Sequence, residues 1–184
     1  MKIIGISGSP RQDGNTDRLV RQILDGASTA GAQTSFHHVA ELNIKGCTGC
    51  TTCRATGLCV LKDDMPPLLL EILDADAVVF GTPVYMGQMT GQLKTFVDRL
   101  LPVLKTDYTS RLVKRPAMVW VFTQGNGDPA AFRTYMDQTS HFLGFLGFTP
   151  KDILCATGTR AKDDMEKQTD LLAQASQLGA KLAQ

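Results

Sequence analysis

The sequence lacks an excess of charge of either sign. Its 19 lysines and arginines are balanced by 18 aspartates and glutamates, which gives a formal net charge of +1. Nucleic-acid-binding proteins usually carry a basic excess or a basic stripe, so we expect no nucleic-acid partner. Long hydrophobic runs are lacking too. The first apolar run breaks at Ser7, too short for a signal peptide, and no later run could span a bilayer. We therefore expect a cytoplasmic protein with no membrane partner.

Motifs of several common enzyme classes are also missing. The sequence contains neither a Ser–His–Asp set nor a pair of carboxylates that would indicate a hydrolase. The loop after the first apolar run has neither the glycine spacing of the dinucleotide fingerprint nor the GK[ST] of a P-loop. With 43% hydrophobic and 20% charged residues, the composition is that of a globular protein, and we expect one domain over residues 1–184.

What the sequence does contain is an alternation of short apolar runs with longer stretches of helical period. The runs predict strands at 2–7, 34–39, 77–86, 116–125 and 153–156, and the stretches predict helices at 16–29, 64–75, 90–104, 128–143 and 165–182. This alternation predicts an α/β fold with a doubly wound, parallel five-stranded sheet of strand order 2-1-3-4-5. Segment 41–66 interrupts the alternation as a loop insertion after the second strand.

A polar loop, SGSPRQDGNT at 7–16, follows the first predicted strand and precedes a helix. Parallel sheets bind ligands beyond the carboxyl ends of their strands, and free amides at a helix N-terminus favour an anion. A phosphate monoester suits this loop better than a pyrophosphate. The alternative is a polar turn that only caps the helix. The side chains that could donate hydrogen bonds are Ser7, Ser9, Arg11, Asn15 and Thr16.

Four of the five cysteines lie within thirteen residues, in the pattern C-x2-C-x2-C-x5-C formed by Cys47, Cys50, Cys53 and Cys59. Structural zinc usually takes two C-x2-C pairs with a longer spacer, so this compact run is more typical of a [4Fe–4S] cluster. A disulfide is less expected in a reducing compartment. The fifth cysteine, Cys155, falls in a predicted strand and is interpreted as a small buried hydrophobic residue.

Three loops together resemble those of the flavodoxin-like NAD(P)H-dependent FMN reductase family. GSPRxxGNT (8–16) resembles its phosphate loop, GTPVYMGQ (81–88) the segment that wraps the flavin ring, and TQGNGD (123–128) a third loop on the same rim. The resemblance implies bound FMN, and no catalytic side chain is expected because the flavin carries the chemistry. The implied FMN contacts are Ser7, Ser9, Pro10, Arg11, Asn15, Thr16, Thr82, Pro83, Val84, Tyr85, Met86, Gly87, Gln124, Gly125 and Asn126.

The cysteine run at this position resembles that of the iron–sulfur flavoproteins within the same superfamily. This likeness implies a [4Fe–4S] cluster that passes electrons to or from FMN, in a homodimer or homotetramer. NAD(P)H or reduced ferredoxin would be the donor, and a small molecule or a protein the acceptor. Three alternatives stay open: a cluster-free NAD(P)H-dependent FMN or quinone reductase, a flavodoxin-type electron carrier without catalysis, and a zinc-stabilised interaction module.

Overall fold

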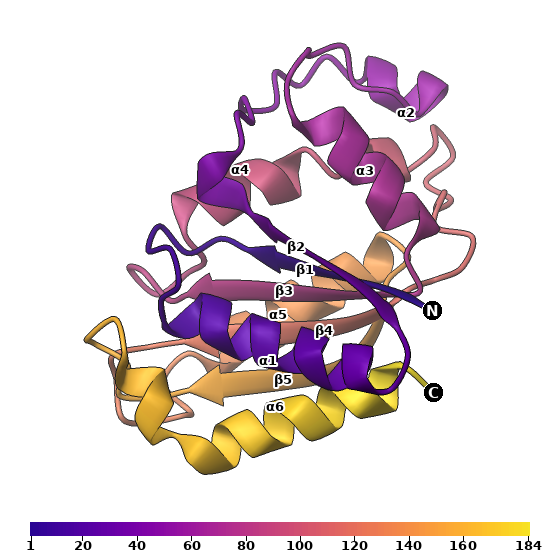
Figure 1. The fold of residues 1–184 in the computed structure, drawn as a ribbon. Helices are drawn as coiled ribbons and strands as arrows, with labels where there is room; N and C mark the ends of the chain where they lie inside the picture. The colour runs from indigo at the N-terminus through magenta and orange to yellow at the C-terminus, as the bar shows by residue number, and fades with distance from the viewer.

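The structure, a computed structural model, describes all residues 1–184 and contains the predicted parallel sheet. The strands lie in the order β2-β1-β3-β4-β5, and each neighbouring pair is parallel. The predicted fold class and strand order are therefore confirmed (Figure 1). The strands are β1 (Lys2–Ser7), β2 (Gln33–His38), β3 (Ala77–Pro83), β4 (Ala117–Thr123) and β5 (Thr149–Ala156).

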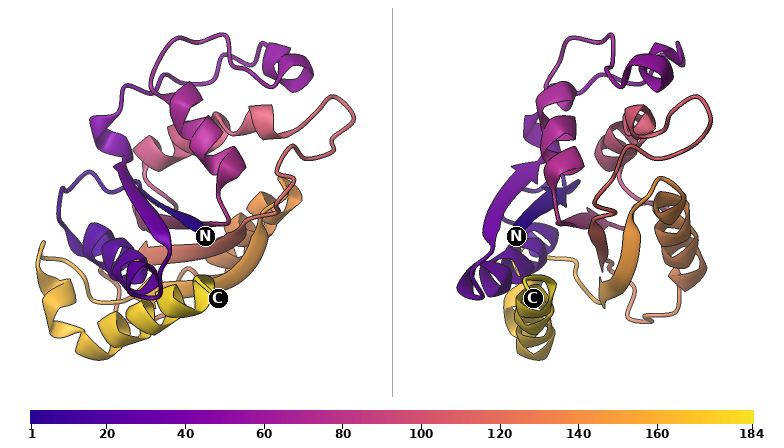
Figure 2. Two further views of the ribbon diagram at one scale, coloured as in Figure 1. Left: turned by 45° about the vertical axis from the view of Figure 1, so that its right-hand side comes forward. Right: turned by 90° about the vertical axis from the view of Figure 1, so that its right-hand side faces the viewer.

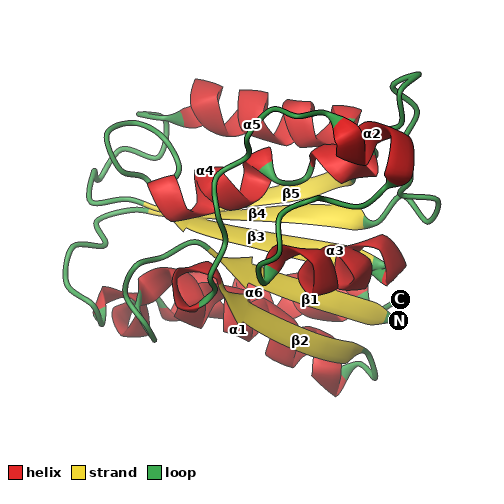
Figure 3. Cartoon of the chain, turned by 90° about the horizontal axis from the view of Figure 1, so that it is seen from above, coloured by secondary structure: helices red, strands yellow, loops and turns green.

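Helices cover both faces of the sheet, as Figures 1 and 3 show. On one face lie α1 (Asn15–Thr29) and α6 (Thr169–Leu182). The other face carries α3 (Met65–Asp74), α4 (Gly91–Asp98) and α5 (Arg133–Phe145), while the short α2 (Thr52–Thr56) belongs to the cysteine segment. None of these helices combines the length and the apolar character that crossing a membrane requires.

Each face of the sheet has its own apolar core, because the side chains of a strand alternate between the two faces. Along β1, Ile3 packs toward α1, whereas Ile4 and Ile6 pack toward α3 and α4. The core toward α3, α4 and α5 is rich in aromatic residues, and the Trp120 and Phe122 rings stack with centroids 5.2 Å apart. These packed layers fix the positions of the loops at the strand ends.

Helices α1 and α6 approach each other with almost no side chain between them. A Cβ atom added at Gly179 would lie only 1.8 Å from the carbonyl oxygen of Ile23, and one at Gly26 would lie 2.1 Å from that of Ser176. Glycine is therefore required at both positions by the closeness of the two backbones.

The predicted helices at 90–104 and 128–143 have the wrong bounds. The helix expected over 90–104 ends at Asp98, and a separate 3₁₀ turn that contains Pro102 follows. Proline favours the first turn of a helix and disrupts a helix interior, so the chain begins a new turn there. The helix expected from 128 begins at Arg133 instead, because the Asp128 carboxylate accepts from the backbone N–H of Ala130 in a preceding turn.

The C-terminal elements and the cysteine segment also differ from the prediction. β5 begins at Thr149 rather than at 153, and it is an edge strand, where Pro150 is tolerated. The last helix begins at Thr169, after a 3₁₀ turn at Asp164–Lys167. Helix α2 lies within the cysteine segment, where no helix was predicted.

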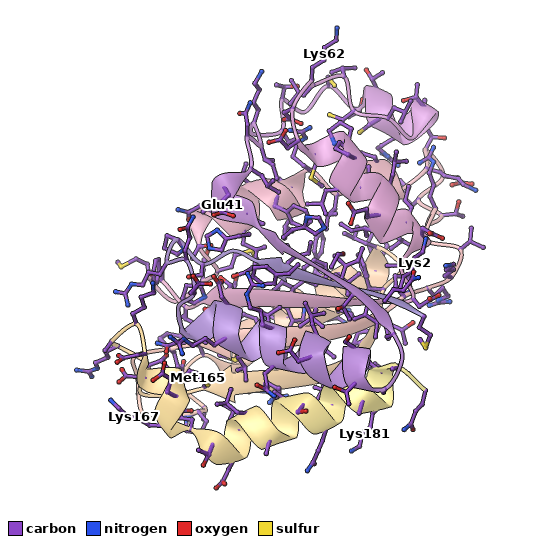
Figure 4. The ribbon with its side chains drawn as sticks, in the orientation of Figure 1. Lys2, Glu41, Lys62, Met165, Lys167 and Lys181 are labelled. Atoms are coloured by element: carbon purple, nitrogen blue, oxygen red, sulfur yellow. The ribbon has the colours of Figure 1, made fainter.

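The segment between β2 and α3 extends away from the sheet, with α2 at its far end (Figure 2). In Figure 4 the labelled Lys62 projects outward from the same end of the molecule. Hydrogen bonds join the two ends of this segment: the N–H of Asn43 donates to the Asp64 carboxylate over 2.7 Å, and the N–H of Asp64 donates to the Asn43 carbonyl over 3.1 Å. The cysteines therefore lie on a closed loop whose two ends are joined next to the start of α3.

Candidate functional site

The loop after β1 is held against β3 and α4 by its backbone. The N–H of Gly8 donates to the Gly81 carbonyl over 2.8 Å, and the Thr90 hydroxyl donates to the Gly8 carbonyl over 2.6 Å. Further along, the Ser9 hydroxyl accepts from the N–H of Arg11 over 3.0 Å and donates to the Arg11 carbonyl over 3.1 Å. These hydrogen bonds fix the conformation of the loop.

A buried carboxylate supports this loop from beneath. Asp17, in the first turn of α1, accepts hydrogen bonds from the Ser7 hydroxyl and from the N–H of Asp13. Burial raises the pKa of Asp17, while the Ser7 hydrogen bond and the nearby His38 oppose that rise. The His38 ring lies 3.5 Å from the carboxylate, without a hydrogen bond. The Ser7 side chain therefore points into the interior. Sequence reasoning did not identify Asp17 and His38 as residues that support this loop.

The loop after β5 completes the site. Sequence reasoning did not identify this loop as part of the site. The Asn15 side chain donates to the Ala161 carbonyl over 2.6 Å and accepts from the N–H of Met165 over 2.8 Å. The Arg11 guanidinium donates to the Arg160 carbonyl over 2.9 Å. Both side chains were predicted to contact phosphate, and both also fix this C-terminal loop. The sequence signal was weak, a Gly–Thr–Arg run after the last strand.

A cavity of about 240 Å³ lies where these loops meet the loops after β3 and β4. In Figure 1 the arrowheads of β1, β3 and β4 point toward the same end of the sheet, so the three predicted loops share one rim. Hydroxyl groups and two guanidinium groups supply donors suited to an anion, beside the N-terminus of α1. The lining residues are Ser9, Arg11, Asn15, Thr16, Pro83, Tyr85, Thr123, Gly125, Thr159 and Arg160.

The predicted segment after β3 forms a tight turn. The N–H of Val84 donates to the Thr123 carbonyl, and Tyr85 and Gln88 form two backbone hydrogen bonds with each other. Met86 and Gly87, with φ of 50° and 81°, form the tip of the turn, and the Met86 side chain is fully exposed. The amides of Met86 and Gly87 therefore remain free for a ligand, whereas that of Val84 does not.

Thr82 and Gln124 lie at the base of this rim, and both are buried. The Thr82 hydroxyl donates to the Pro83 carbonyl over 2.9 Å and accepts from the N–H of Thr90, so it has a structural use. The Gln124 amide donates to the Asp128 carbonyl over 2.8 Å, but its Oε1 has no partner. A buried unpaired acceptor is costly, so a ligand with an N–H or O–H group would stabilise it.

The third predicted loop uses its own polar groups for its turn. Asn126 accepts from the N–H of Asp128 over 2.9 Å, and the N–H of Thr159 donates to the Gln124 carbonyl over 2.9 Å. Arg160 donates to the Gly125 carbonyl over 3.2 Å. The loops after β4 and β5 therefore form one wall of the cavity.

The four clustered cysteines are free thiols with different exposure: Cys47 and Cys50 are exposed, Cys59 is half-buried, and Cys53, on α2, is buried. Burial raises the pKa of the Cys53 thiol, and the negative charges of the Cys59, Cys50 and Cys47 thiolates raise it further. In this conformation no three side chains converge closely enough to hold a metal ion.

A buried ion pair lies next to this cysteine segment. Arg99 directly follows α4, and its guanidinium makes two hydrogen bonds, of 2.6 and 3.0 Å, to the Asp63 carboxylate. Both side chains are at most 1% exposed. The guanidinium first of all, and then two backbone N–H groups, lower the pKa of Asp63 to about 2 despite its burial. The Nε of Arg99 is buried and has no partner.

The residues present fit the implied FMN, whereas the four thiols supply ligands of the type that a cluster takes but do not converge in this conformation. The polar cavity, with its two guanidinium groups and several hydroxyl groups, suits a phosphorylated ligand, and the unpaired Gln124 oxygen and the free amides of the turn after β3 belong to neighbouring parts of the same rim. Cys47, Cys50, Cys53 and Cys59 are free thiols of one segment, which is the ligand type that an iron–sulfur cluster takes.

A doubly wound parallel sheet whose ligand loops lie at the strand order reversal defines the flavodoxin-like class of protein. Residues 1–174 match the profile of the NADPH-dependent FMN reductase family, and the chain belongs to that family.

Curated relatives bear names that match the cysteine run. An iron-sulfur flavoprotein of Archaeoglobus fulgidus is 34% identical over 189 residues, covering 100% of this chain and 80% of that protein. One of Methanocaldococcus jannaschii is 42% identical over 103 residues, covering 56% of this chain and 53% of the relative. The second match therefore spans only about half of the relative's length.

Solved structures share the fold at low identity. An NAD(P)H:quinone oxidoreductase from Methanothermobacter marburgensis is 17% identical with a TM-score of 0.80, over 100% of this chain and 96% of the other. An FMN-dependent NADH-azoreductase from Bacillus anthracis, solved with FMN, is 15% identical with a TM-score of 0.74, over the full length of both chains. At these identities the likeness concerns the fold alone.

Proposed function

We propose that this chain is an FMN-dependent oxidoreductase that also carries a [4Fe–4S] cluster, with electrons passing between the two groups. The observation that carries the proposal is the cavity at the carboxyl ends of β1, β3, β4 and β5, lined by guanidinium, hydroxyl and amide donors. Its position and its donors are those that a phosphorylated cofactor needs. Because the chain belongs to the NADPH-dependent FMN reductase family, we propose that this cofactor is FMN.

Several groups would hold FMN in this cavity. Ser9, Arg11 and Thr16 would bind the phosphate together with Arg160, at the positively charged end of α1. Asn15 would act there chiefly by fixing the loop after β5. The free amides of Met86 and Gly87 and the unpaired Gln124 oxygen would serve the flavin and its ribityl chain. When bound, FMN supplies the redox chemistry, while the protein contributes orientation and hydrogen bonds.

The cluster would be held by Cys47, Cys50, Cys53 and Cys59. Helix α2 fixes Cys53, and Gly57, with φ of 79°, reverses the chain so that Cys59 returns toward the others. The Cys47 and Cys50 thiols are exposed in this conformation, so they would be the solvent-facing ligands of the four. A bound cluster adds one-electron exchange to the chemistry of FMN.

We also propose NAD(P)H as the electron donor, with reduced ferredoxin as the alternative, and a quinone-like small molecule or a protein as the acceptor. A homodimer is proposed because an apolar groove of about 510 Å³ lies between α4 and α5, beside the exposed Phe142. One FMN-binding unit over residues 1–184 and a cytoplasmic location complete the proposal. The five free cysteines suit that compartment.

The test is the iron, sulfide and FMN content of protein purified without oxygen. We expect about four iron and four sulfide ions per chain beside one FMN, with visible absorbance that bleaches on reduction. Cys53→Ser should lose the iron and sulfide and retain FMN. Cys155→Ser is the matched control, because Cys155 is a partly buried thiol of β5 outside the cluster segment, and it should retain all three.

A cluster-free FMN reductase is the second candidate, favoured by the exposure of Cys47 and Cys50 and by the lack of a converged metal site in this conformation. Flavin without iron or sulfide, even after anaerobic reconstitution, together with rapid NAD(P)H oxidation by a quinone, would establish this candidate instead. Iron and sulfide without flavin would contradict both.

A further inference from the structure

Two buried titratable side chains face each other next to the loop after β1. They are His38, the last residue of β2, and Asp17, in the first turn of α1. The Nε2 of His38 lies 3.5 Å from the Oδ2 of Asp17, and the side chains are only 4% and 1% exposed. Both ring nitrogens of His38 are buried, and neither has a hydrogen-bond partner. An unpaired buried polar group is costly, so this imidazole calls for a role beyond packing.

The Asp17 carboxylate connects His38 to the loop. Its Oδ1 accepts from the Ser7 hydroxyl, and its Oδ2, the oxygen that faces His38, accepts from the N–H of Asp13 over 2.9 Å. The Ser7 hydroxyl oxygen accepts in turn from the N–H of Ser9 over 3.3 Å. Ser9 lines the cavity proposed for FMN. Two successive hydrogen bonds therefore lead from the carboxylate to that cavity.

His38 also lines a second cavity, of about 420 Å³, on the other side of the loop. Protons therefore reach the ring from that side. The charged side chains around the pair are Arg11 from the loop, Arg21 from α1, Glu41 after β2 and Lys162 after β5. Arginine and lysine keep their charge near neutral pH, so a proton gained here goes to the imidazole or to a carboxylate.

A proton shared by His38 and Asp17 changes the charge next to the loop. Placed between Nε2 and Oδ2, it turns the present contact into a charge-assisted hydrogen bond. It also cancels the negative charge that Asp17 places in the first turn of α1, where the helix dipole favours an anion. Water and salt screen this charge little, because both side chains are buried.

We propose that His38 is a positioning residue for the loop after β1, and that a proton held between His38 and Asp17 strengthens the binding of the FMN phosphate. This inference rests on the proposed binding of FMN. His38 does not contact the phosphate itself and acts only through Asp17. Without the proton, the negative charge of the carboxylate opposes the phosphate across the Ser7 and Ser9 hydrogen bonds.

The test compares the Kd for FMN of wild-type and His38→Gln apoprotein at pH 8 and pH 5.5, measured by quenching of flavin fluorescence. The phosphate of FMN changes its own charge at about pH 6, but it does so equally for both proteins. The Kd of the variant divided by that of wild type should rise about fivefold from pH 8 to pH 5.5, because only wild type gains the charge of the imidazole. A residue that only packs would give a ratio independent of pH, and that result, or a falling ratio, would overturn the proposal.

His37→Gln is the matched control. His37 is the neighbour of His38 on β2, and side chains alternate between the two faces of a strand. Its Nε2 lies 2.9 Å from the Glu71 carboxylate, and its side chain is 22% exposed. Replacing it removes a histidine that does not contact Asp17, so the variant should show the wild-type dependence of Kd on pH.

A second measurement needs neither a variant nor FMN. In nuclear magnetic resonance spectra of the wild-type apoprotein, the amide signals of Ser9 and Asp13 should shift with the same pH midpoint as the ring proton of His38. Amides that do not follow the ring would overturn the link from His38 to the loop. Amides that follow it in a protein that binds no FMN at either pH would instead refute the proposed function.

Discussion

Replacing Gly8 by alanine places a side chain where the first loop meets α4. A Cβ at this position would lie 2.4 Å from the Cβ of Leu93 and 3.2 Å from the Thr90 hydroxyl oxygen. Carbon atoms in contact lie about 3.5–4.0 Å apart, so the loop or the helix must move by about 1 Å. Because Leu93 is buried in the core, the loop is the part that moves.

Overpacking of this kind costs about 1–3 kcal/mol. The displaced loop carries Ser9 and Arg11, and its link to α4, the 2.6 Å hydrogen bond from Thr90 to the Gly8 carbonyl, would be strained. If binding restores the native loop, FMN affinity falls by the same free energy, which is about 5–150-fold in Kd. Quenching of flavin fluorescence on titration of the apoprotein measures Kd, and the thermal midpoint of the apoprotein reports strain that remains without FMN.

Gly127→Ala is the control, because it lies on the same rim and its added Cβ has no atom within 4 Å. It should bind FMN as wild type does. A Gly8→Ala protein with both wild-type affinity and wild-type thermal midpoint would refute the reasoning that the loop after β1 binds FMN in the position described here.

Three further outcomes are expected. Asp63→Asn should lower the free energy of unfolding by about 2 kcal/mol at pH 7. The pKa of Asp63 falls from 3.8 to about 2 in the folded protein, and each pKa unit is worth about 1.36 kcal/mol. Little of this is lost to screening, because the carboxylate is fully buried. Since the folded pKa is the lower one, this difference should persist above about pH 4.5, shrink as the pH falls and nearly vanish by pH 2; urea unfolding at several pH values measures it, and a constant difference would contradict it. Gly179→Ala should lower the thermal midpoint by several degrees, because its Cβ would lie 1.8 Å from the Ile23 carbonyl oxygen; an unchanged midpoint would show that α1 and α6 separate freely. Tyr135→Phe should loosen the turn after β3 and cost about 1 kcal/mol, since its hydroxyl accepts from the N–H of Met89 over 3.0 Å; faster amide exchange at Met89 would confirm this, and unchanged exchange would contradict it.

Much of the fold could be predicted because the strands are short apolar runs bounded by polar loops. The run at 2–7 and the strand order followed from this alternation, and the motifs at 8–16, 81–88 and 123–128 were placed on the correct strand ends. Helix ends were harder, because they depend on which local hydrogen bond competes best. The helix expected from 128 begins only at Arg133, because Asp128 closes a turn with Ala130 instead.

The parts of the site that could not be predicted depend on partners far apart in the sequence. Nothing near Asn15 indicates that its amide will bind Ala161, 146 positions away. Likewise, Asp63 looked like one of two acidic residues before a helix, and only the fold brings it to Arg99. Such pairs leave no periodic pattern, because each residue alone resembles an ordinary surface charge.

The link from Asn15 to Ala161 and Met165 has a consequence for a chain that is still being synthesised. The first loop and α1 leave the ribosome early, whereas the residues that fasten them are among the last to be made. At about 5–20 residues per second, 146 positions correspond to a delay of roughly 7–30 s. During this interval the nascent chain has the loop after β1 without the wall that closes the cavity. In the proposed function, FMN would therefore be held firmly only after the C-terminal segment has been made.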